Sequence, residues 1–246
     1  MFRLKLCDQI EVYDVITYRL QRFLNVPNAS GLVDVTSCEH HRCVYFSDFM
    51  QQCVHRLDSE REITQWPVRD EPQSLSVNAA HNVLVTCRRV RKIKEFSSHG
   101  DWLRTLSLPD DVVNPWHAIQ LTSGQLVVCH GNTFDDVHRV CSMSADCGEI
   151  VCSHGGRSGS DTGQHNVPRQ MAVDGNDFMF VADVINRRVT LLSPTLNYVR
   201  HAVESDQLKG SPRRLCLDVQ RRFLYVADNE WNNVAYRAGR IVVFRV

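Results

Sequence analysis

A unit of about 40 residues recurs along the chain, and this repetition restricts the fold more than any other feature. Each copy has an alternating apolar run, a polar turn, a second apolar run that ends in a short polar residue, and a third run. The clearest copies are VPRQMAVDGNDFMFVADVINRRVTLLS (167–193) and SPRRLCLDVQRRFLYVADNE (211–230). Four copies open at prolines separated by 43, 53 and 44 residues: Pro72, Pro115, Pro168 and Pro212.

Within each copy the apolar residues alternate with period two, which is typical of strands rather than helices. Repeats of this length, built from several short strands, are the signature of four-stranded propeller blades. The sequence therefore predicts an all-β fold: a six-bladed β-propeller forming a single domain over 1–246. The expected blade parts are approximately 1–26, 31–66, 70–108, 113–153, 166–203 and 210–246.

The two terminal blades are predicted to be incomplete. Residues 1–26 match the last three strands of a blade, and 212–246 supply the first three. Because neither set completes the other, we expect the chain to be a fragment or a trimmed product. The one long step between prolines contains HGGRSGSDTGQHN (154–166), whose Gly and Ser content predicts an inserted flexible loop.

Composition gives no global electrostatic preference, since 28 Lys and Arg balance 28 Asp and Glu. The N-terminal residues lack the apolar core of a signal peptide, and no run approaches the roughly 20 apolar residues of a membrane span. We therefore expect a cytoplasmic protein with no membrane contact. In that compartment the 10 cysteines are expected to be reduced, several of them as small buried hydrophobes.

Two segments, FVADVINRRVTLLS and YVADNE…GRIVVF, resemble NHL repeats, in which a strand ending in Ala-Asp precedes a turn, an Asn, a basic residue and another strand. The best match comprises Asp183, Asn186, Arg187 and Arg188, and looser copies extend the resemblance over nearly the whole chain. No Trp-Asp dipeptide closes a blade, as it would in WD40 repeats. NHL domains often end tripartite-motif proteins, after a RING, B-boxes and a coiled coil. None of these is present here.

The resemblance implies a recognition module for a protein partner or for single-stranded RNA. Its first candidate surface is a basic turn after a strand: Arg88, Arg89, Arg91, Lys92 and Lys94. Such a cluster could bind RNA phosphates or an acidic peptide. The alternative is a solvated strand edge, where basic residues prevent unwanted strand pairing. Alternation would then place Arg89 and Arg91 on one face and Lys92 and Lys94 on the other.

Aromatic residues in polar segments form the second candidate group. Trp116 with His117, and Trp231, are expected to act as exposed binding anchors or to stack on unpaired bases. The alternative for Trp116 is packing between blades. Arg187, the basic residue of the best repeat, completes the predicted partner-binding set.

Metal and enzyme interpretations receive less support. Cys38 and Cys43 flank two histidines in a hairpin, but structural zinc needs four ligands, and only Cys53 and His55 stand near in sequence. A metal-dependent lactonase or lyase would need carboxylates converging from the innermost strands. The polar residues available there stand at non-matching points: Asp34, Ser76, Gln120, Asp174 and Asp218. The 11 histidines scatter over loops.

These observations predict a non-enzymatic scaffold that binds a protein partner through propeller-face loops. It could dock substrates for a ubiquitin-ligase-type protein. The alternatives are single-stranded RNA binding on a basic face and a metal-dependent lactonase-like or lyase-like enzyme. No cofactor, metal or small-molecule substrate is expected.

Overall fold

The computed structural model describes residues 2–4, 9–229, 231–232, 235–236 and 239–246. Over these residues the chain is built from strands, with one short 3-10 helix, η1 (Ser205–Gln207). The chain divides into two compact units, Met1–Leu108 and Pro109–Val246. No helix in the described ranges has the length and apolar character needed to cross a bilayer.

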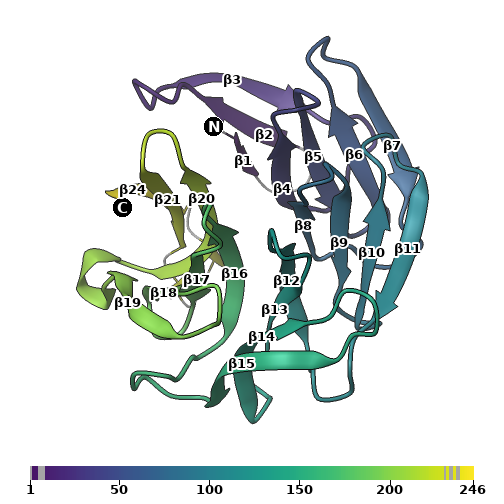
Figure 1. Ribbon diagram of the computed structural model, residues 1–246. Helices are drawn as coiled ribbons and strands as arrows, with labels where there is room; N and C mark the ends of the chain where they lie inside the picture. Colours follow the sequence, from purple (N-terminus) through teal and green to yellow (C-terminus); the bar gives the residue numbers. More distant parts are fainter. Residues whose placement is uncertain (1, 5–8, 230, 233–234, 237–238) are drawn as a thin grey trace. The chain divides into compact units, whose positions relative to one another are not determined.

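The first unit contains three antiparallel sheets whose strands follow in sequence order (Figure 1). The first sheet has three strands, β1 (Phe2–Leu4), β2 (Gln9–Tyr13) and β3 (Leu20–Asn25). The second has β4 (Leu32–Cys38), β5 (Cys43–Asp48), β6 (Cys53–Leu57) and β7 (Ile63–Pro67). The third has β8 (Ser74–Val77), β9 (Val83–Cys87), β10 (Lys92–Phe96) and β11 (Trp102–Ser107).

The second unit repeats this pattern. One sheet has β12 (Pro115–Gln120), β13 (Leu126–His130), β14 (Val137–Met143) and β15 (Ile150–Arg157), and the next has β16 (Pro168–Val173), β17 (Met179–Asp183), β18 (Arg188–Leu192) and β19 (Tyr198–Val203). The last combines β20 (Ser211–Asp218), β21 (Phe223–Asn229) and β24 (Arg240–Arg245). Strands β22 (Trp231–Asn232) and β23 (Ala235–Tyr236) pair as a separate hairpin.

Four sheets therefore have the four strands of a complete blade, and the first and last sheets have three each. The all-β blade architecture is confirmed, but the prediction of six blades is not. That number counted the two terminal sheets as incomplete blades, and among the described residues each of them has three of the four strands of a blade.

Sheets within a unit stack because their second strands are apolar on both faces. In β5, Tyr45 enters the core shared with β8–β11, and the next residue, Phe46, enters the core shared with β2 and β3. In β17, Val181 faces the β12–β15 sheet and Phe180 faces the β20–β21–β24 sheet. Since successive side chains of a strand point to opposite faces, each such strand needs a sheet on both sides to hide its apolar residues.

Hydrogen bonds between first strands link neighbouring sheets. The Leu75 amide of β8 donates to Asp34 Oδ2 of β4 at 2.9 Å, and the Leu215 amide of β20 donates to Gln170 Oε1 of β16 at 2.7 Å. Both acceptors are buried and stand two residues after the start of their repeat. Asp34 and Gln170 are therefore structural acceptors, which gives the repeat a reason to carry a polar residue at this point.

The aspartate that ends the second strand joins the start of its own sheet to the following turn. Asp48, fully buried, accepts the Ser30 amide at 2.8 Å and the Gln51 amide at 2.9 Å. Asp228 likewise accepts the Lys209 and Gly210 amides at 3.1 and 2.8 Å. The Ala-Asp signature of the sequence therefore satisfies backbone donors that the turn geometry leaves without strand partners.

Asp183 has the most extensive set of such contacts. It accepts the Asn166 amide at 2.6 Å, Asn186 Nδ2 at 2.8 Å and Arg188 Nε at 2.9 Å, and His165 lies 3.5 Å away. Burial alone would raise the pKa of Asp183, but His165, the Asn166 amide and Asn186 together bring that pKa below its usual value.

The segment 154–166 is held in place, in contrast to the flexible loop expected from its composition. Residues 154–157 belong to β15. Arg188 donates to the carbonyls of Ser160 and Gln164 at 2.6 and 2.8 Å, and Asn186 Nδ2 donates to the Gly159 carbonyl at 2.7 Å. Gly and Ser content alone did not show that a buried arginine would supply these bonds.

The nine cysteines among the described residues are free thiols. Most lie inside strands, and burial raises the pKa of Cys87 and of Cys141 to about 12. Thiols with such pKa values stay protonated at neutral pH and react slowly, because the thiolate is the nucleophile.

The buried aspartate allows a stability test. Replacing Asp183 by Ala leaves Arg188 and the Asn166 amide without their acceptor, and we expect a loss of about 3–5 kcal/mol in urea denaturation at pH 7. Asp183→Asn keeps one acceptor oxygen and should cost less. Because the folded-state pKa is lowered, the contribution of Asp183 is present at neutral pH and declines as pH falls below the unfolded value. An Ala variant as stable as the native chain would contradict this account.

Thiol accessibility gives a second test. In the native protein, iodoacetamide should modify the exposed Cys147 within minutes, whereas Cys129 and Cys141 should react only after denaturant is added. Peptide mass spectrometry over time would measure both rates. Equal rates for Cys147 and Cys129 in the folded protein would mean that the β13–β14 region is not packed as described.

Candidate binding surface

In each unit, the turns between the second and third strands of the complete blades are the best candidates for a binding surface. They span residues 49–52, 88–91, 131–136 and 184–187. In each unit the two turns lie at the same end of adjacent sheets. Contacts between the first-to-second-strand turns at the opposite end, His40 with His81 in one unit and Thr122 with Asp177 in the other, align the sheets in this way.

Each of these four turns exposes one large apolar side chain. The exposed fractions are 67% for Met50, 41% for Val90, 95% for Phe134 and 49% for Ile185, and we call these four residues the apolar tips. At the opposite end of the sheets, the described turns expose large apolar residues at only two places, Ile16 with Tyr18 and Val219. The repeated exposure at one end is a property of the turn, not of a single blade.

Hydrogen bonds fix the turn that carries Phe134. Asp135 Oδ2 accepts the Asn132 amide at 2.7 Å, and Asn132 Oδ1 accepts the Phe134 amide at 2.8 Å. Asn114 Nδ2, from the loop before β12, also donates to Asp135 at 2.9 Å. The ring is therefore displayed from a constrained backbone, which lowers the entropy that binding would cost.

The turn that carries Ile185 is held by the Asp183 contacts described above. The Ile185 amide donates to the Asn166 carbonyl at 3.0 Å. Arg187, predicted from the sequence as a binding residue, follows at the fourth position with a φ of 53° and is exposed. The same turn thus exposes a cation and an aliphatic side chain.

The basic cluster lies at the β9–β10 turn and the first half of β10, and acidic residues neutralise part of it. Arg89 contacts Glu71 Oε1 at 2.5 Å, and Lys94 Nζ contacts Asp70 Oδ2 at 2.6 Å. Lys94 also donates to the Val68 carbonyl at 2.6 Å, so its side chain lies against the β7–β8 loop. The alternative of a sheet edge is wrong, because β10 pairs with both β9 and β11.

The five cations of the cluster divide between the turn and the strand that follows it. Arg88, Arg89 and Arg91 belong to the turn, whereas Lys92 and Lys94 stand in β10. Of the two cations of the cluster in the ion pairs above, Arg89 is the more exposed, with 78% of its side chain accessible against 13% for Lys94. The exposed part of the cluster therefore lies at the turn, where Arg89 and Val90 are both exposed.

Trp116 and His117 are not exposed, so their prediction as surface anchors is wrong. Both lie in β12 and are buried, at 9% and 3% exposure. Trp116 Nε1 donates to the Gly131 carbonyl at 2.9 Å, and the Arg169 guanidinium lies 4.2 Å from the ring centroid. The alternative, packing between blades, is the observed one, because the Trp116 core cluster combines residues of the β12–β15 and β16–β19 sheets.

The backbone of Trp231 lies in β22, paired with Tyr236, but its side chain falls outside the described residues. The exposed tips that sequence reasoning missed are Met50, Phe134 and Ile185. A single apolar residue inside a polar turn, as in GNTFDD (131–136), was the available signal.

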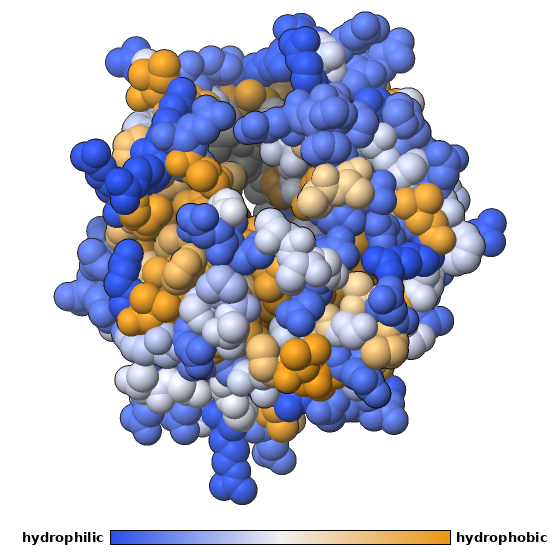
Figure 2. Space-filling model, viewed as in Figure 1, coloured by the Kyte–Doolittle hydropathy of each residue, from blue (hydrophilic) through white to orange (hydrophobic). Residues whose placement is uncertain are grey.

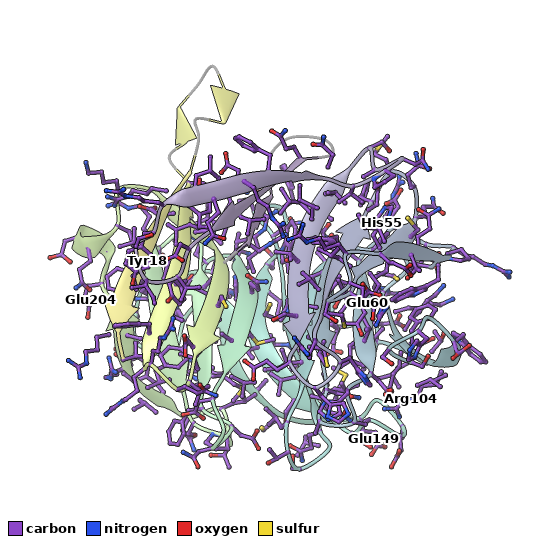
Figure 3. The ribbon with its side chains drawn as sticks, turned by 90° about the horizontal axis from the view of Figure 1, so that it is seen from above. Tyr18, His55, Glu60, Arg104, Glu149 and Glu204 are labelled. Carbon is purple, nitrogen blue, oxygen red and sulfur yellow. The ribbon has the colours of Figure 1, made fainter. Side chains whose placement is uncertain are left out.

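No zinc arrangement forms around the Cys38–Cys43 hairpin. These two residues pair across β4 and β5 and are buried in the apolar core. Cys53 pairs with Asp48 at the opposite end of β5. His55, which is labelled in Figure 3, is also in β6. Its Nε2 atom lies 3.4 Å from Cys53 Sγ and 3.6 Å from Asp48 Oδ2. Burial lowers the pKa of His55 against the opposing effect of Asp48. Among the described residues, no group of three or more His, Cys, Asp or Glu is arranged to hold a metal ion.

The face seen in Figure 2 is mainly hydrophilic, with separate hydrophobic patches in place of one continuous apolar area. Isolated exposed apolar residues are common on proteins and carry no meaning singly. Their recurrence at equivalent turns is what distinguishes the apolar tips.

Comparison with known proteins supports the fold. No family model matches the chain, and no curated protein matches it either. Solved structures that resemble it include a streptogramin B lyase (17% identity, 91% of this chain and 71% of that chain, TM-score 0.62). Others are a protein of unknown function from Bacteroides caccae (15%, 91% and 80%, 0.68) and hydrazine synthase from Kuenenia stuttgartiensis (14%, 97% and 90%, 0.68). At these identities the likeness shows the fold alone, and the chain is an all-β propeller.

Proposed function

We propose that this chain is a non-enzymatic recognition module that binds a protein partner through the turns between the second and third strands of its blades. The observation that carries the proposal is the exposure of one large apolar residue at each of the four described turns. Burial of exposed apolar side chains is the main favourable term in protein association, and a few such residues usually dominate the affinity.

Phe134 and Ile185 are the two apolar tips with the best support as binding residues. They stand at the same end of two sheets that share one core, and both turns are held by buried or partly buried side-chain hydrogen bonds. Phe134 makes the larger contribution, because an aromatic ring at 95% exposure gains the most from burial against a partner.

The neighbouring charges suggest the chemistry of the partner. Arg187 in the turn of Ile185, and Arg89 in the turn of Val90, each favour a segment that combines apolar and acidic side chains. Substrate docking for a ubiquitin-ligase-type protein, which the NHL resemblance implies, is the specific role that we propose for such a surface. The lyase activity named for one similar structure is not transferred, because 17% identity or less supports the shared fold alone.

Partner capture tests the apolar tips. We expect Phe134→Ser and Ile185→Ser to reduce the recovery of specifically bound proteins from a cell lysate by about 30-fold each, as for anchors worth about 2 kcal/mol. Quantitative mass spectrometry would compare each variant with the native chain. Val219→Ser is the matched control, since it removes an exposed apolar side chain at the other end of the sheets. Equal recovery with Phe134→Ser and Val219→Ser would reject the surface.

RNA binding is the outcome that would replace the protein-partner proposal. Fluorescence anisotropy with a labelled poly(U) oligonucleotide at 50 and 200 mM salt would detect it, because phosphate contacts give a steep salt dependence. We expect little binding at either concentration. Tight binding at 50 mM that is lost in a variant with Ala at Arg88, Arg89 and Arg91 would assign the basic turn to RNA.

A further inference from the structure

Four histidines from three different turns of the first unit lie together, although they are far apart in the sequence. His40 and His41 come from the β4–β5 turn, His81 from the β8–β9 turn and His99 from the β10–β11 turn. The rings of His40 and His81 are stacked, with centroids 4.0 Å apart and an angle of 3°. The His41 ring lies 4.7 Å from His40, 5.7 Å from His81 and 6.2 Å from His99. We call these four residues the histidine cluster.

The same position in the second unit is occupied by a different kind of contact. His40 and Thr122 are each the second residue of a four-residue turn, 39–42 and 121–124. Their partners, His81 and Asp177, are each the fourth residue of the corresponding turn in the next sheet, and both have a φ of 63°. In the second unit the Thr122 amide and hydroxyl donate to the Asp177 carboxylate. In the first unit the equivalent link consists of two stacked imidazoles.

We propose that the histidine cluster is a proton-sensitive contact between two adjacent blades, which holds the β4–β5 and β8–β9 turns together when the rings are neutral and releases them when the rings are protonated. Two neutral imidazoles stack favourably at 4.0 Å, whereas two imidazolium ions at the same separation repel each other. The Thr122–Asp177 link has no histidine and therefore lacks this response.

Charged groups of both signs surround the cluster. Arg56 of β6 adds positive charge and lies 3.6 Å from Asp58. Glu95 of β10 is the carboxylate bound to the β8–β9 turn, and it already accepts Asn78, Asn82 and the Arg104 guanidinium at 2.9, 2.8 and 2.7 Å. Glu39 and Arg42 flank the histidines of the β4–β5 turn, and Asp101, in the turn of His99, accepts the Ser97 hydroxyl. Ser98 joins this turn to the sheet, because its carbonyl accepts Tyr45.

The pKa of His41 is shifted by this environment. Burial lowers its pKa first, and the charges of His40, His81, His99 and Arg56 lower it further. A histidine whose folded-state pKa is lowered takes up its proton more readily in the released state. The contribution of His41 to the cluster is therefore fully present above the unfolded pKa of about 6.5 and weakens as pH falls below it.

Hydrogen–deuterium exchange at the turn amides tests the proposal. The His81 amide bonds to the Asn78 carbonyl at 2.9 Å and the Arg42 amide to the Glu39 carbonyl at 3.1 Å, so opening of either turn exposes them. Between pH 7.5 and pH 5.5, with EDTA present, we expect protection of both turns to fall severalfold after correction for intrinsic rates, because the released state takes up protons more readily. Peptides covering the Thr122 and Asp177 turns are the internal control and should not change in this way.

A double variant, His40→Thr with His81→Asp, introduces into the first unit the residue types of the Thr122–Asp177 pair. Aspartate tolerates the positive φ at this position, as Asp177 does in the equivalent turn. We expect the turns of this variant to stay protected at pH 5.5. If the variant does not fold, His40→Ala removes the stack alone and should likewise abolish the pH dependence.

Nuclear magnetic resonance of the histidine rings gives a readout that does not depend on stability. The titration midpoint of His41 should rise toward the ordinary value when His81 is replaced by Asn, because one of the charges that lower it is removed. A pH-dependent loss of protection of equal size in the native chain and the double variant would overturn the proposal. So would an unchanged His41 midpoint together with unchanged protection at low pH.

Discussion

The structure depends on strands that are apolar on both faces. In β5 and β17, consecutive side chains enter two different cores, so one sheet cannot hide its apolar residues without a neighbour on each side. Tyr45 and Phe46 illustrate this most directly, since both are fully buried and belong to separate clusters. The stacked blades of each unit follow from this requirement, and the turns at the blade ends are positioned as a consequence.

Much of this could be predicted from the sequence, because the repeat is local. Strand positions and blade phase follow from alternation, from the prolines and from the aspartates that end second strands. The sequence did not explain why those aspartates are present. Asp48, Asp183 and Asp228 each satisfy backbone amides from a segment that lies 17 to 19 residues away in the chain. Such partners depend on how the sheet folds back on itself, and no residue pattern specifies them.

The candidate site was harder to predict, because exposure is decided by neighbouring sheets. Trp116 stands among polar residues in the sequence, yet the β16 strand covers it and Arg169 lies over its ring. Phe134 is also surrounded by polar residues and is almost fully exposed. The local sequences around these two aromatics give similar signals, and only the position, strand in one case and turn in the other, separates them. The same reasoning explains why 11 scattered histidines gave no hint of a cluster of four.

The two ends of the blades have different chemistry, and the hydrogen bonding explains how this is possible. At the end of the apolar tips, the buried Asp48 and Asp183 bind groups of the turns that follow them, and the apolar tips of those turns, Met50 and Ile185, stay exposed. At the other end, the turns contact one another through their own side chains, as Thr122 does with Asp177 and His40 with His81. A change of side chain there alters the link between blades rather than the surface offered to a partner. Recognition and response to pH can therefore vary independently in one repeat architecture.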